Sequence, residues 1–423
     1  MSSKNRGFHG KFKTGRRDCI IKTDGQNSGY MKNSNRALIL ELLATERANT
    51  RIGLSKITGL SKMTVTNIIA DFINSGLIVS GDEQVYGRVG RKPRTLSLAK
   101  NSPLLAGIYV SREEIHGLLC DIQLNVISRH SLTLTHETPE TFSEKLTTIC
   151  GKLISGTSRP VWGVGVASIG PVDSSTGILL NPRNFFGICD LDLRSLLSKH
   201  CGLPVFVEND MNAAALAELY YGAGQDYESF LYIGLTNGVG AGFVNDRRLY
   251  QPEYGLAGEI GHTGVDLCGD PCSCGRRGCV ELYTSVPVLE KKLAACTGQH
   301  KTFAAYCGMN VPEITETLAD AVSILSYALL NQVNMLNPQA VLLGHESAHL
   351  PPPLIQRLAD TLNQGKLWGQ HNKVHVHVSH YGSMSPVFGA VCTALSHWFS
   401  GELPEPLLYN DIHTGDKERK EWS

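Results

Sequence analysis

Two neighbouring segments decide the fold of this chain: Gly258-Glu259-Ile260-Gly261-His262 and Cys272-Ser273-Cys274-Gly275-Arg276-Arg277-Gly278-Cys279-Val280-Glu281. The two segments bring one histidine and three cysteines within eighteen residues, and this combination is a usual ligand set for structural, tetrahedral Zn²⁺. The sequence therefore predicts a zinc site with four ligands: His262, Cys272, Cys274 and Cys279. The alternative is a disulfide or a group of buried thiols. It is disfavoured because Cys272 and Cys274 are too close to pair with each other, and because thiols inside a cell stay reduced.

Two carboxylates flank the predicted zinc ligands, Glu259 and Glu281. Three thiolates already over-neutralise one Zn²⁺ ion, so neither glutamate is needed to balance its charge. We expect both to face another ligand, and we infer that this ligand is a sugar.

The two segments resemble the signature of the ROK family, which contains sugar kinases and sugar-responsive repressors. The matching pattern is Glu-x-x-His, nine residues, and then Cys-x-Cys-Gly-x-x-Gly-Cys-x-Glu. The resemblance implies that His262 and the three cysteines hold zinc. It also implies that Glu259, His262 and Glu281 face the hydroxyl groups of a bound hexose.

The composition is that of a large folded protein. A chain of 423 residues implies two or three domains, and 42% hydrophobic residues can supply their cores. No segment approaches the twenty apolar residues of a membrane span, and the polar N-terminus lacks the core of a signal peptide. We therefore expect a cytoplasmic protein without membrane insertion.

The net charge of zero conceals an asymmetry. Residues 1–98 carry 17 Lys and Arg against 7 Asp and Glu, so the remaining residues are acidic to the same extent. A basic first quarter indicates contact with a polyanion. The alternative is a solvated, lysine-rich leader.

The pattern of residues 33–98 predicts a winged helix-turn-helix. Residues 1–32 show no apolar period and are expected to be a flexible basic arm. A first helix follows from Asn33, a short second helix follows Thr50, and Ser61 caps a third helix over residues 62–74. The third helix would enter the major groove of double-stranded DNA through five residues: Lys62, Met63, Thr64, Thr66 and Asn67.

Two short strands, residues 77–79 and 95–98, would form the wing. The loop between them has glycine hinges and four cations suited to phosphates or the minor groove: Arg88, Arg91, Lys92 and Arg94. The alternative is a three-helix bundle that binds protein. The segment also resembles the N-terminal domain of ROK repressors, which the kinases of the family lack.

From residue 103 to 400, apolar strands alternate with helices, which indicates an α/β fold. The resemblance implies a two-lobed, actin-like architecture of the ribonuclease-H-like, sugar-kinase type around a cleft. Asn209 and Asp210 follow a strand at its C-terminal end, where such folds place ligands. They resemble the sugar-binding pair of the family, and the alternative is helix capping. Asp173 and Asn184 are looser candidates, and residues 401–423 are expected to be a polar surface tail.

The phosphate-binding segments depart from those of ROK kinases. The turn at 109–114 lacks the glycines of the kinase Asp-x-Gly-Gly-Thr turn and contains two carboxylates. The second loop, 236–242, has lost one glycine and a threonine, and the later Gly-Gly pair is Gly344-His345. Because three segments that would hold ATP are altered, the sequence predicts a protein that is not an enzyme.

These observations favour a sugar-responsive repressor of carbohydrate genes. It would act as a homodimer or tetramer on palindromic operator DNA and respond to a small sugar or sugar phosphate. One alternative is a DNA-bound regulator sequestered by a sugar-transport protein, as for some ROK repressors. The other is an active hexose or N-acetylhexosamine kinase.

Overall fold

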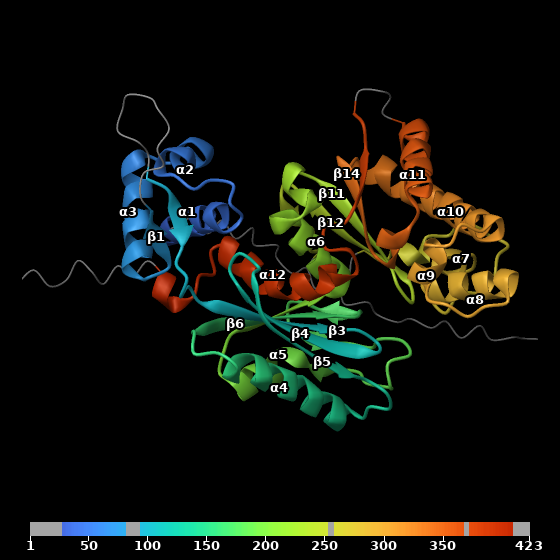
Figure 1. Cartoon of the computed structure of the whole chain (residues 1–423), viewed down its shortest axis with the longest axis horizontal. Coiled ribbons are helices and arrows are strands. Elements are labelled where there is room, and N and C mark those ends of the chain that lie inside the picture. The colour runs from blue at the N-terminus through green and yellow to red at the C-terminus, as the bar shows by residue number, and fades with distance from the viewer. Residues whose placement is uncertain (1–27, 82–93, 253–257, 368–371, 409–423) are drawn as a thin grey trace, which may run out of the picture.

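The computed structural model describes residues 28–81, 94–252, 258–367 and 372–408. They form a first domain of three helices with a two-stranded sheet, followed by two α/β lobes that each contain a five-stranded sheet (Figure 1). Within these residues, no helix combines the length and the apolar character that crossing a lipid bilayer requires.

The first domain consists of α1 (Ser28–Ala44), α2 (Arg51–Thr58), α3 (Lys62–Asn74), β1 (Ile78–Ser80) and β2 (Leu96–Leu98), and the two strands pair antiparallel. The prediction of a helix over 62–74 is confirmed, and its cap is formed as expected: the Ser61 hydroxyl accepts a hydrogen bond from the Thr64 amide at 3.1 Å. Gly59 ends α2 at φ 70°, a conformation that favours glycine.

The predicted arm was too long at its C-terminal end. Helix α1 begins at Ser28, so residues 28–32 are helical. The apolar segment of α1 nucleates the helix, and extending a helix backwards over polar residues costs less than starting one.

The first lobe contains a sheet with strand order β10-β6-β3-β4-β5. Its strands are β3 (Leu104–Val110), β4 (Glu114–Asp121), β5 (Val126–Thr133), β6 (Val161–Ser168) and β10 (Val205–Asn209). β3, β6 and β10 are parallel, whereas β4 and β5 pair antiparallel. Helices α4 (Pro139–Ser155) and α5 (Leu193–Cys201) share an apolar core with this sheet. A small sheet adds β7 (Val172–Asp173), β8 (Ile178–Leu179) and β9 (Leu191–Asp192).

The second lobe contains a sheet with strand order β13-β12-β11-β14-β15. Its strands are β11 (Phe230–Leu235), β12 (Val239–Asn245), β13 (Arg248–Leu249), β14 (Ala340–His345) and β15 (His375–Val378). Its helices are α7 (Glu281–Thr284), α8 (Val286–Thr297), α9 (Phe303–Cys307), α10 (Pro312–Leu336) and α11 (Pro352–Gly365). Short 3₁₀ turns complete the chain: η1 (Ala223–Asp226), η2 (Ile260–His262), η3 (Glu346–His349), η5 (Gly382–Met384) and η6 (Glu405–Leu407).

Two helices, α6 (Asp210–Tyr221) and α12 (Ser385–Phe399), pack against each other between the lobes (Figure 1). Their contact depends on small residues, since a Cβ atom on Gly389 would lie 2.3 Å from the Ala213 carbonyl oxygen. Similarly, a Cβ atom on Gly165 of β6 would lie 1.7 Å from the Ala390 carbonyl oxygen. Two α/β lobes joined by these helices confirm the predicted α/β, actin-like architecture.

The predicted polar tail also needs a correction. Leu403 and Leu407 are buried and belong to the apolar cluster that contains the core of the first domain. The chain after α12 therefore contributes to the core as far as Leu407, because two leucines four residues apart can pack together in an otherwise polar segment. Residues 409–423 lie outside the described part of the chain.

Candidate functional site

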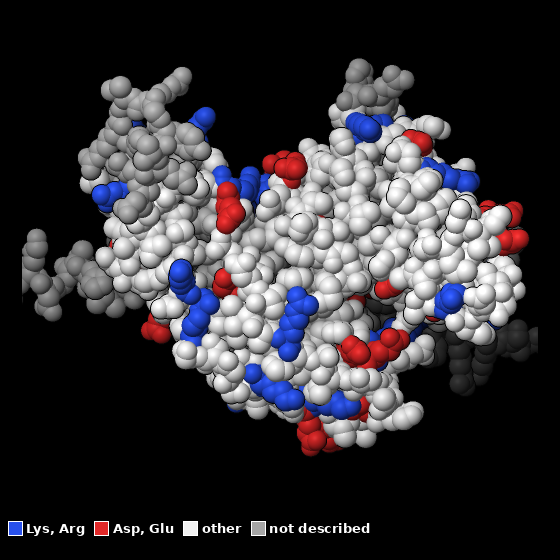
Figure 2. All heavy atoms as spheres, viewed as in Figure 1, with Lys and Arg blue, Asp and Glu red and all other residues white. Residues whose placement is uncertain are grey.

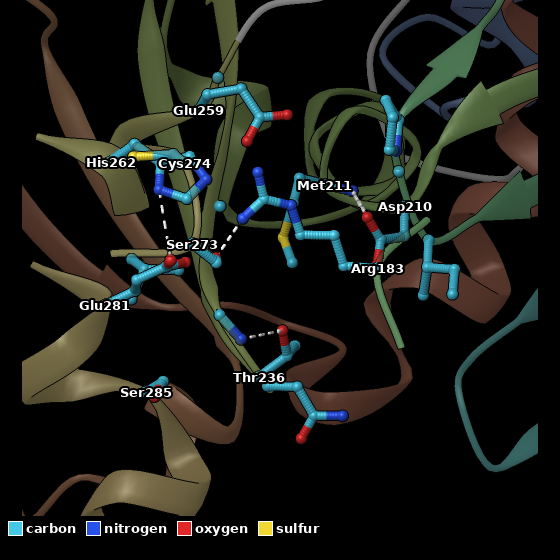
Figure 3. A pocket seen from close by; sticks show the side chains of 18 of the residues that line it. Arg183, Asp210, Met211, Thr236, Glu259, His262, Ser273, Cys274, Glu281 and Ser285 are labelled. Carbon is cyan, nitrogen blue, oxygen red and sulfur yellow. Dashed lines mark hydrogen bonds and ion pairs between the residues drawn. The ribbon is translucent and has the colours of Figure 1, made fainter. Parts of the chain in front are cut away.

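A polar cleft of about 650 Å³ separates the two lobes. The first lobe lines it with the end of β10 and with Asn181, Arg183 and Asn184. The second lobe lines it with the β11–β12 turn and the cysteine-containing loop (Figure 3). All five sugar-site residues predicted from the sequence line this one cleft: Asn209, Asp210, Glu259, His262 and Glu281. Asn184 lines it too, whereas Asp173 closes a turn by accepting hydrogen bonds from Ser175.

Asn209 both caps a helix and borders the cleft. Its side-chain oxygen accepts a hydrogen bond from the Met211 amide at 2.9 Å, as a helix N-cap does. Its amide nitrogen lies close to Gly170 on the cleft wall, 2.8 Å from where a Cβ atom of that glycine would be. Capping and cleft lining, which the sequence presented as alternatives, therefore coexist in this residue.

Asp210 is a buried acid at the edge of the cleft. Burial raises the pKa of Asp210 to about 7, although hydrogen bonding to the Met211 amide and the nearby Arg112 guanidinium favour the ionised form. A carboxyl group with such a pKa is partly ionised at neutral pH, so it can either donate or accept a hydrogen bond with a sugar hydroxyl.

A buried glutamate supports this corner of the cleft. Glu208 accepts hydrogen bonds from the Ser174 hydroxyl at 2.7 Å, from the Asn212 amide group at 3.0 Å and from Gln251. It also accepts from the Asn209 amide at 2.8 Å. These contacts fix the start of α6, and hence the positions of Asn209 and Asp210.

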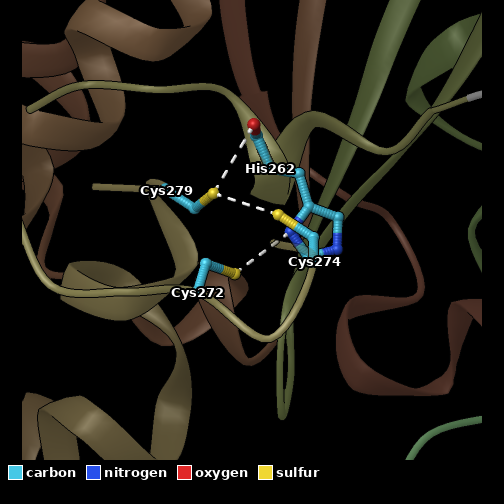
Figure 4. Close-up of side chains that lie close together, drawn as sticks. All are labelled: His262, Cys272, Cys274 and Cys279. Atoms are coloured by element: carbon cyan, nitrogen blue, oxygen red, sulfur yellow. Dashed lines mark hydrogen bonds between the residues drawn. The ribbon is translucent and has the colours of Figure 1, made fainter. Parts of the chain in front are cut away.

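Four potential metal ligands lie together beside the cleft (Figure 4). The ligand atoms of His262, Cys272, Cys274 and Cys279 all lie within 4.8 Å of one another. Cys274 Sγ and Cys279 Sγ are 3.6 Å apart, as are Cys272 Sγ and His262 Nδ1. Donors at these separations fit around one tetrahedral ion with bonds of about 2.0–2.3 Å.

The loop that holds these ligands relies on glycine. Gly275 and Gly278 have φ values of 89° and 59°, and a Cβ atom on Gly278 would lie 1.7 Å from the Asp266 carbonyl oxygen. The Arg276 amide helps to lower the pKa of Cys274 to about 6, which favours the thiolate that a metal requires. Cys268 is exposed and does not belong to this group.

Glu281 contacts both the metal-ligand group and the cleft. Its Oε1 lies 3.2 Å from His262 Nδ1 and 3.2 Å from Cys272 Sγ, and the side chain also lines the cleft. The sequence predicted that both glutamates face a ligand other than the metal, and both do line the cleft. Glu281 also contacts two of the potential metal ligands, because α7 starts at Glu281, two residues after Cys279.

Two arginines of the cleft were not predicted from the sequence. Arg183 follows β8 and donates a hydrogen bond to the Ser273 hydroxyl in the cysteine loop of the opposite lobe (Figure 3). Arg112 follows β3 and donates to the carbonyl oxygens of Arg183 and Asn184. Arg112 lies in the turn that was compared with the kinase phosphate turn, and Arg183 precedes the looser candidate Asn184, but neither position in the sequence indicates these contacts.

The glycines of the β11–β12 hairpin have a packing role. Cβ atoms on Gly234 and Gly240 would lie 2.4 Å and 2.7 Å from side-chain atoms of Met211, and one on Gly242 would lie 2.7 Å from the Met211 carbonyl oxygen. Close contact with α6 therefore requires these glycines whether or not a phosphate binds. His345, which follows Gly344, is buried, and burial lowers the pKa of His345 to about 4, so this side chain is neutral.

The predicted DNA-contacting residues of α3 lie at its N-terminal end. Lys62, Met63, Thr66 and Asn67 are exposed, whereas Thr64 is half-buried and its hydroxyl lies 2.9 Å from that of Ser61. Arg94 is exposed just before β2. The other predicted wing cations, Arg88, Arg91 and Lys92, lie outside the described residues.

Most of the basic residues that cause the charge asymmetry also lie outside the described residues. Of the 17 basic residues among residues 1–98, ten belong to residues 1–27 and 82–93. On the face seen in Figure 2, the described basic and acidic side chains are interspersed. The predicted basic surface therefore stays a prediction.

Comparisons with known proteins agree with this architecture. Residues 105–397 match the ROK family. The chain is 27% identical to the xylose repressor of Bacillus subtilis (strain 168) over 378 residues, which are 87% of this chain and 97% of that repressor.

Solved structures give the same fold. A ROK family transcriptional regulator, a homolog of the E. coli MLC protein, is similar with a TM-score of 0.77 and 22% identity, over 90% of this chain and 99% of the regulator. A ROK hexokinase from Thermus thermophilus is similar with a TM-score of 0.59 and 26% identity, over 69% of this chain and 97% of the hexokinase.

Proposed function

Because the chain belongs to the ROK family, we propose that it is a sugar-responsive transcriptional repressor that binds operator DNA through its first domain. One observation carries this proposal: a single chain joins a helix with a polar, exposed N-terminal end, α3, to a cleft lined by five sugar-binding candidates. The similarity to a xylose repressor over nearly its whole length supports the same function.

The first domain has the order of elements of a winged helix-turn-helix. Helices α2 and α3 are separated by residues 59–61, and an antiparallel strand pair follows α3. Lys62, Met63, Thr66 and Asn67 would enter the major groove, and Arg94 with the remaining wing cations would contact phosphates. Two such domains in a homodimer or tetramer would occupy a palindromic operator.

The metal site would hold structural zinc. Four N and S donors without an open position suit Zn²⁺ better than Mg²⁺ or Ca²⁺, which prefer oxygen. The ion would take His262 Nδ1 and the three thiolates, which leaves His262 Nε2 to interact with a sugar hydroxyl. Zinc would also fix the loop that carries Ser273 and Glu281.

The effector would be a monosaccharide or its phosphate, held by Asn209, Asp210, Glu259, His262 and Glu281. Such a ligand would draw the lobes together and lower DNA affinity by a coupling free energy of about 1–3 kcal/mol. To test this proposal, a DNA duplex is first selected with the protein from a random library. The affinity of the protein for this duplex is then measured with and without D-xylose, D-glucose or N-acetyl-D-glucosamine. We expect tight, salt-sensitive binding that at least one of these sugars weakens. Failure to select any duplex would contradict the proposal.

A kinase is the second candidate, and Asp210 favours it. A carboxyl group with a pKa near 7 in a hexose cleft can accept the proton of an attacking hydroxyl. A coupled assay for ADP with ATP and each of the three sugars decides between the candidates, with Asp210→Asn as the control. The repressor proposal expects no sugar-dependent turnover.

Sequestration by a sugar-transport protein is the remaining alternative. It predicts no calorimetric heat with any sugar, whereas the repressor proposal predicts binding that is lost when Asn209 or Glu259 is replaced by alanine.

A further inference from the structure

Helix α6 extends from the cleft towards the first domain. It starts at Asp210 beside the cleft and ends at Tyr221, about 16 Å away at 1.5 Å per residue. Every residue from Asp210 to Tyr220 is buried. A helix that is packed on all sides moves as a rigid body, because local bending would open voids in a close-packed interior.

The C-terminal end of α6 contacts the turn between β4 and β5. The Tyr221 hydroxyl donates a hydrogen bond of 2.6 Å to the Ile122 carbonyl oxygen. Glu218, one turn earlier in α6, accepts hydrogen bonds from the Ser379 hydroxyl at 2.6 Å and the His380 amide at 3.1 Å, both after β15. The end of α6 is therefore attached to both lobes.

The same β4–β5 turn contacts the first domain. Gln123, next to Ile122, donates a hydrogen bond of 2.7 Å to Glu46 Oε1, just after α1. Glu46 and Leu124 both have left-handed backbone conformations, at φ 57° and 62°. The turn after α1 and the β4–β5 turn are therefore tight, and their side chains have defined orientations. Two hydrogen bonds thus connect the end of α6 with the end of α1.

The other described contacts between α1 and the lobes include an electrostatic interaction of Glu41 with Arg247 and non-directional packing. Helix α1 packs near the end of α12, where Gly401 approaches Ser34, and the apolar cluster of the first domain continues into Leu403 and Leu407. Apolar packing is non-directional, whereas a hydrogen bond between two tight turns has one preferred geometry.

We propose that the β4–β5 turn, residues 122–125, relays occupancy of the cleft to the DNA-binding domain through Tyr221–Ile122 and Gln123–Glu46. Closure of the lobes around a sugar displaces α6 and the turn, and Gln123 then reorients α1 and with it α3. This inference rests on the proposed function, and it assigns to Gln123 and Tyr221 a positioning role that involves neither sugar nor DNA contact.

The test compares operator affinity with and without a saturating sugar, using the selected duplex and whichever of the three sugars acts on the unaltered protein. Gln123→Leu keeps the size of the side chain but cannot donate. We expect its sugar-free operator Kd and its sugar Kd to stay within about twofold, while the sugar-induced change in operator Kd falls from about 5–150-fold towards onefold. Gln123→Lys should retain the response, because an ammonium group also donates to Glu46.

Two further variants complete the experiment. Tyr221→Phe removes the hydroxyl but keeps the ring, and it should reduce the response like Gln123→Leu. Gln356→Leu is the matched control, because Gln356 is an exposed glutamine that donates to Asp360 within α11, away from α1. This control should respond like the unaltered protein.

The outcomes separate the relay from the proposed function. If the unaltered protein selects no duplex, or if no sugar changes its operator Kd, the proposed function fails and the relay with it. If sugar changes the operator Kd of the unaltered protein, and changes that of Gln123→Leu and of Tyr221→Phe by the same factor, the relay alone is wrong. The relay is also wrong if the two variants lose operator affinity equally with and without sugar, because that result would indicate that the contact is only structural.

Discussion

Arg183 of the first lobe donates a hydrogen bond to the hydroxyl of Ser273 in the second lobe, across the cleft. The two residues are 90 positions apart in the sequence, and Ser273 lies between two of the proposed zinc ligands. Arg112 holds the backbone of Arg183 in place. The separation of the lobes and the position of the metal loop are therefore linked through one contact.

This link predicts the behaviour of Ser273→Ala. Loss of the hydroxyl should weaken sugar binding by about 3–10-fold, since a hydrogen bond to a charged group contributes about 1 kcal/mol or more when partly exposed. Isothermal titration calorimetry measures the affinity, and elemental analysis should show unchanged metal content because no ligand is altered. Unchanged sugar affinity would mean that the contact does not stabilise the bound state.

Metal removal should weaken sugar binding and stability together. Cys274→Ser removes one of the four proposed ligands, so we expect loss of about one equivalent of zinc and a fall in sugar affinity of at least about tenfold. Cys268→Ser is the matched control, because Cys268 lies in the same loop but outside the ligand group. It should keep zinc and affinity, and the two variants behaving alike would contradict the assignment.

The raised pKa of Asp210 predicts a pH dependence of stability. Its folded-state pKa of about 7 exceeds the ordinary value of 3.8, so the native protein binds the extra proton between these pH values. This contribution to stability is complete at low pH and is lost as pH rises towards 7. Asp210→Asn should therefore become more stable than the unaltered protein as pH rises from 5 to 8, by up to a few kcal/mol.

Thermal unfolding at pH 5 and pH 8 measures this difference, and a constant difference would refute the burial argument. Sugar affinity supplies the second readout. Asp210→Asn should bind sugar weakly at both pH values, whereas the affinity of the unaltered protein should rise through pH 7 as the carboxylate ionises and accepts two hydroxyl hydrogen bonds.

Operator recognition should depend on Asn67. This exposed side chain lies one turn into α3, where an amide can bind a base edge, so Asn67→Ala should cost about 1–3 kcal/mol of operator affinity. Asn74→Ala is the control, because Asn74 is exposed at the opposite end of the same helix. Fluorescence anisotropy with the selected duplex should show a loss for the first variant alone.

Local features of the structure were predictable from the sequence. The proposed zinc ligands fall within eighteen residues, and glycines allow a short loop to bring them together, so spacing alone was sufficient. The ends of α3 followed from a capping serine and an apolar period. Asn209 and Asp210 lie at the cleft because a β-strand followed directly by a helix places the residues at their junction at the edge of a sheet.

The tertiary structure alone decided the features that depend on distant segments. The sequence by itself determined the candidates for metal and DNA binding, because residue chemistry, spacing and periodicity act over one loop or helix, and the family resemblance added the candidates for sugar binding. It could not determine that Arg183 reaches Ser273, that Asp210 is buried enough to titrate near pH 7, or that Gln123 meets Glu46. These depend on how two lobes and a third domain pack, and packing energy is shared among residues far apart in the chain.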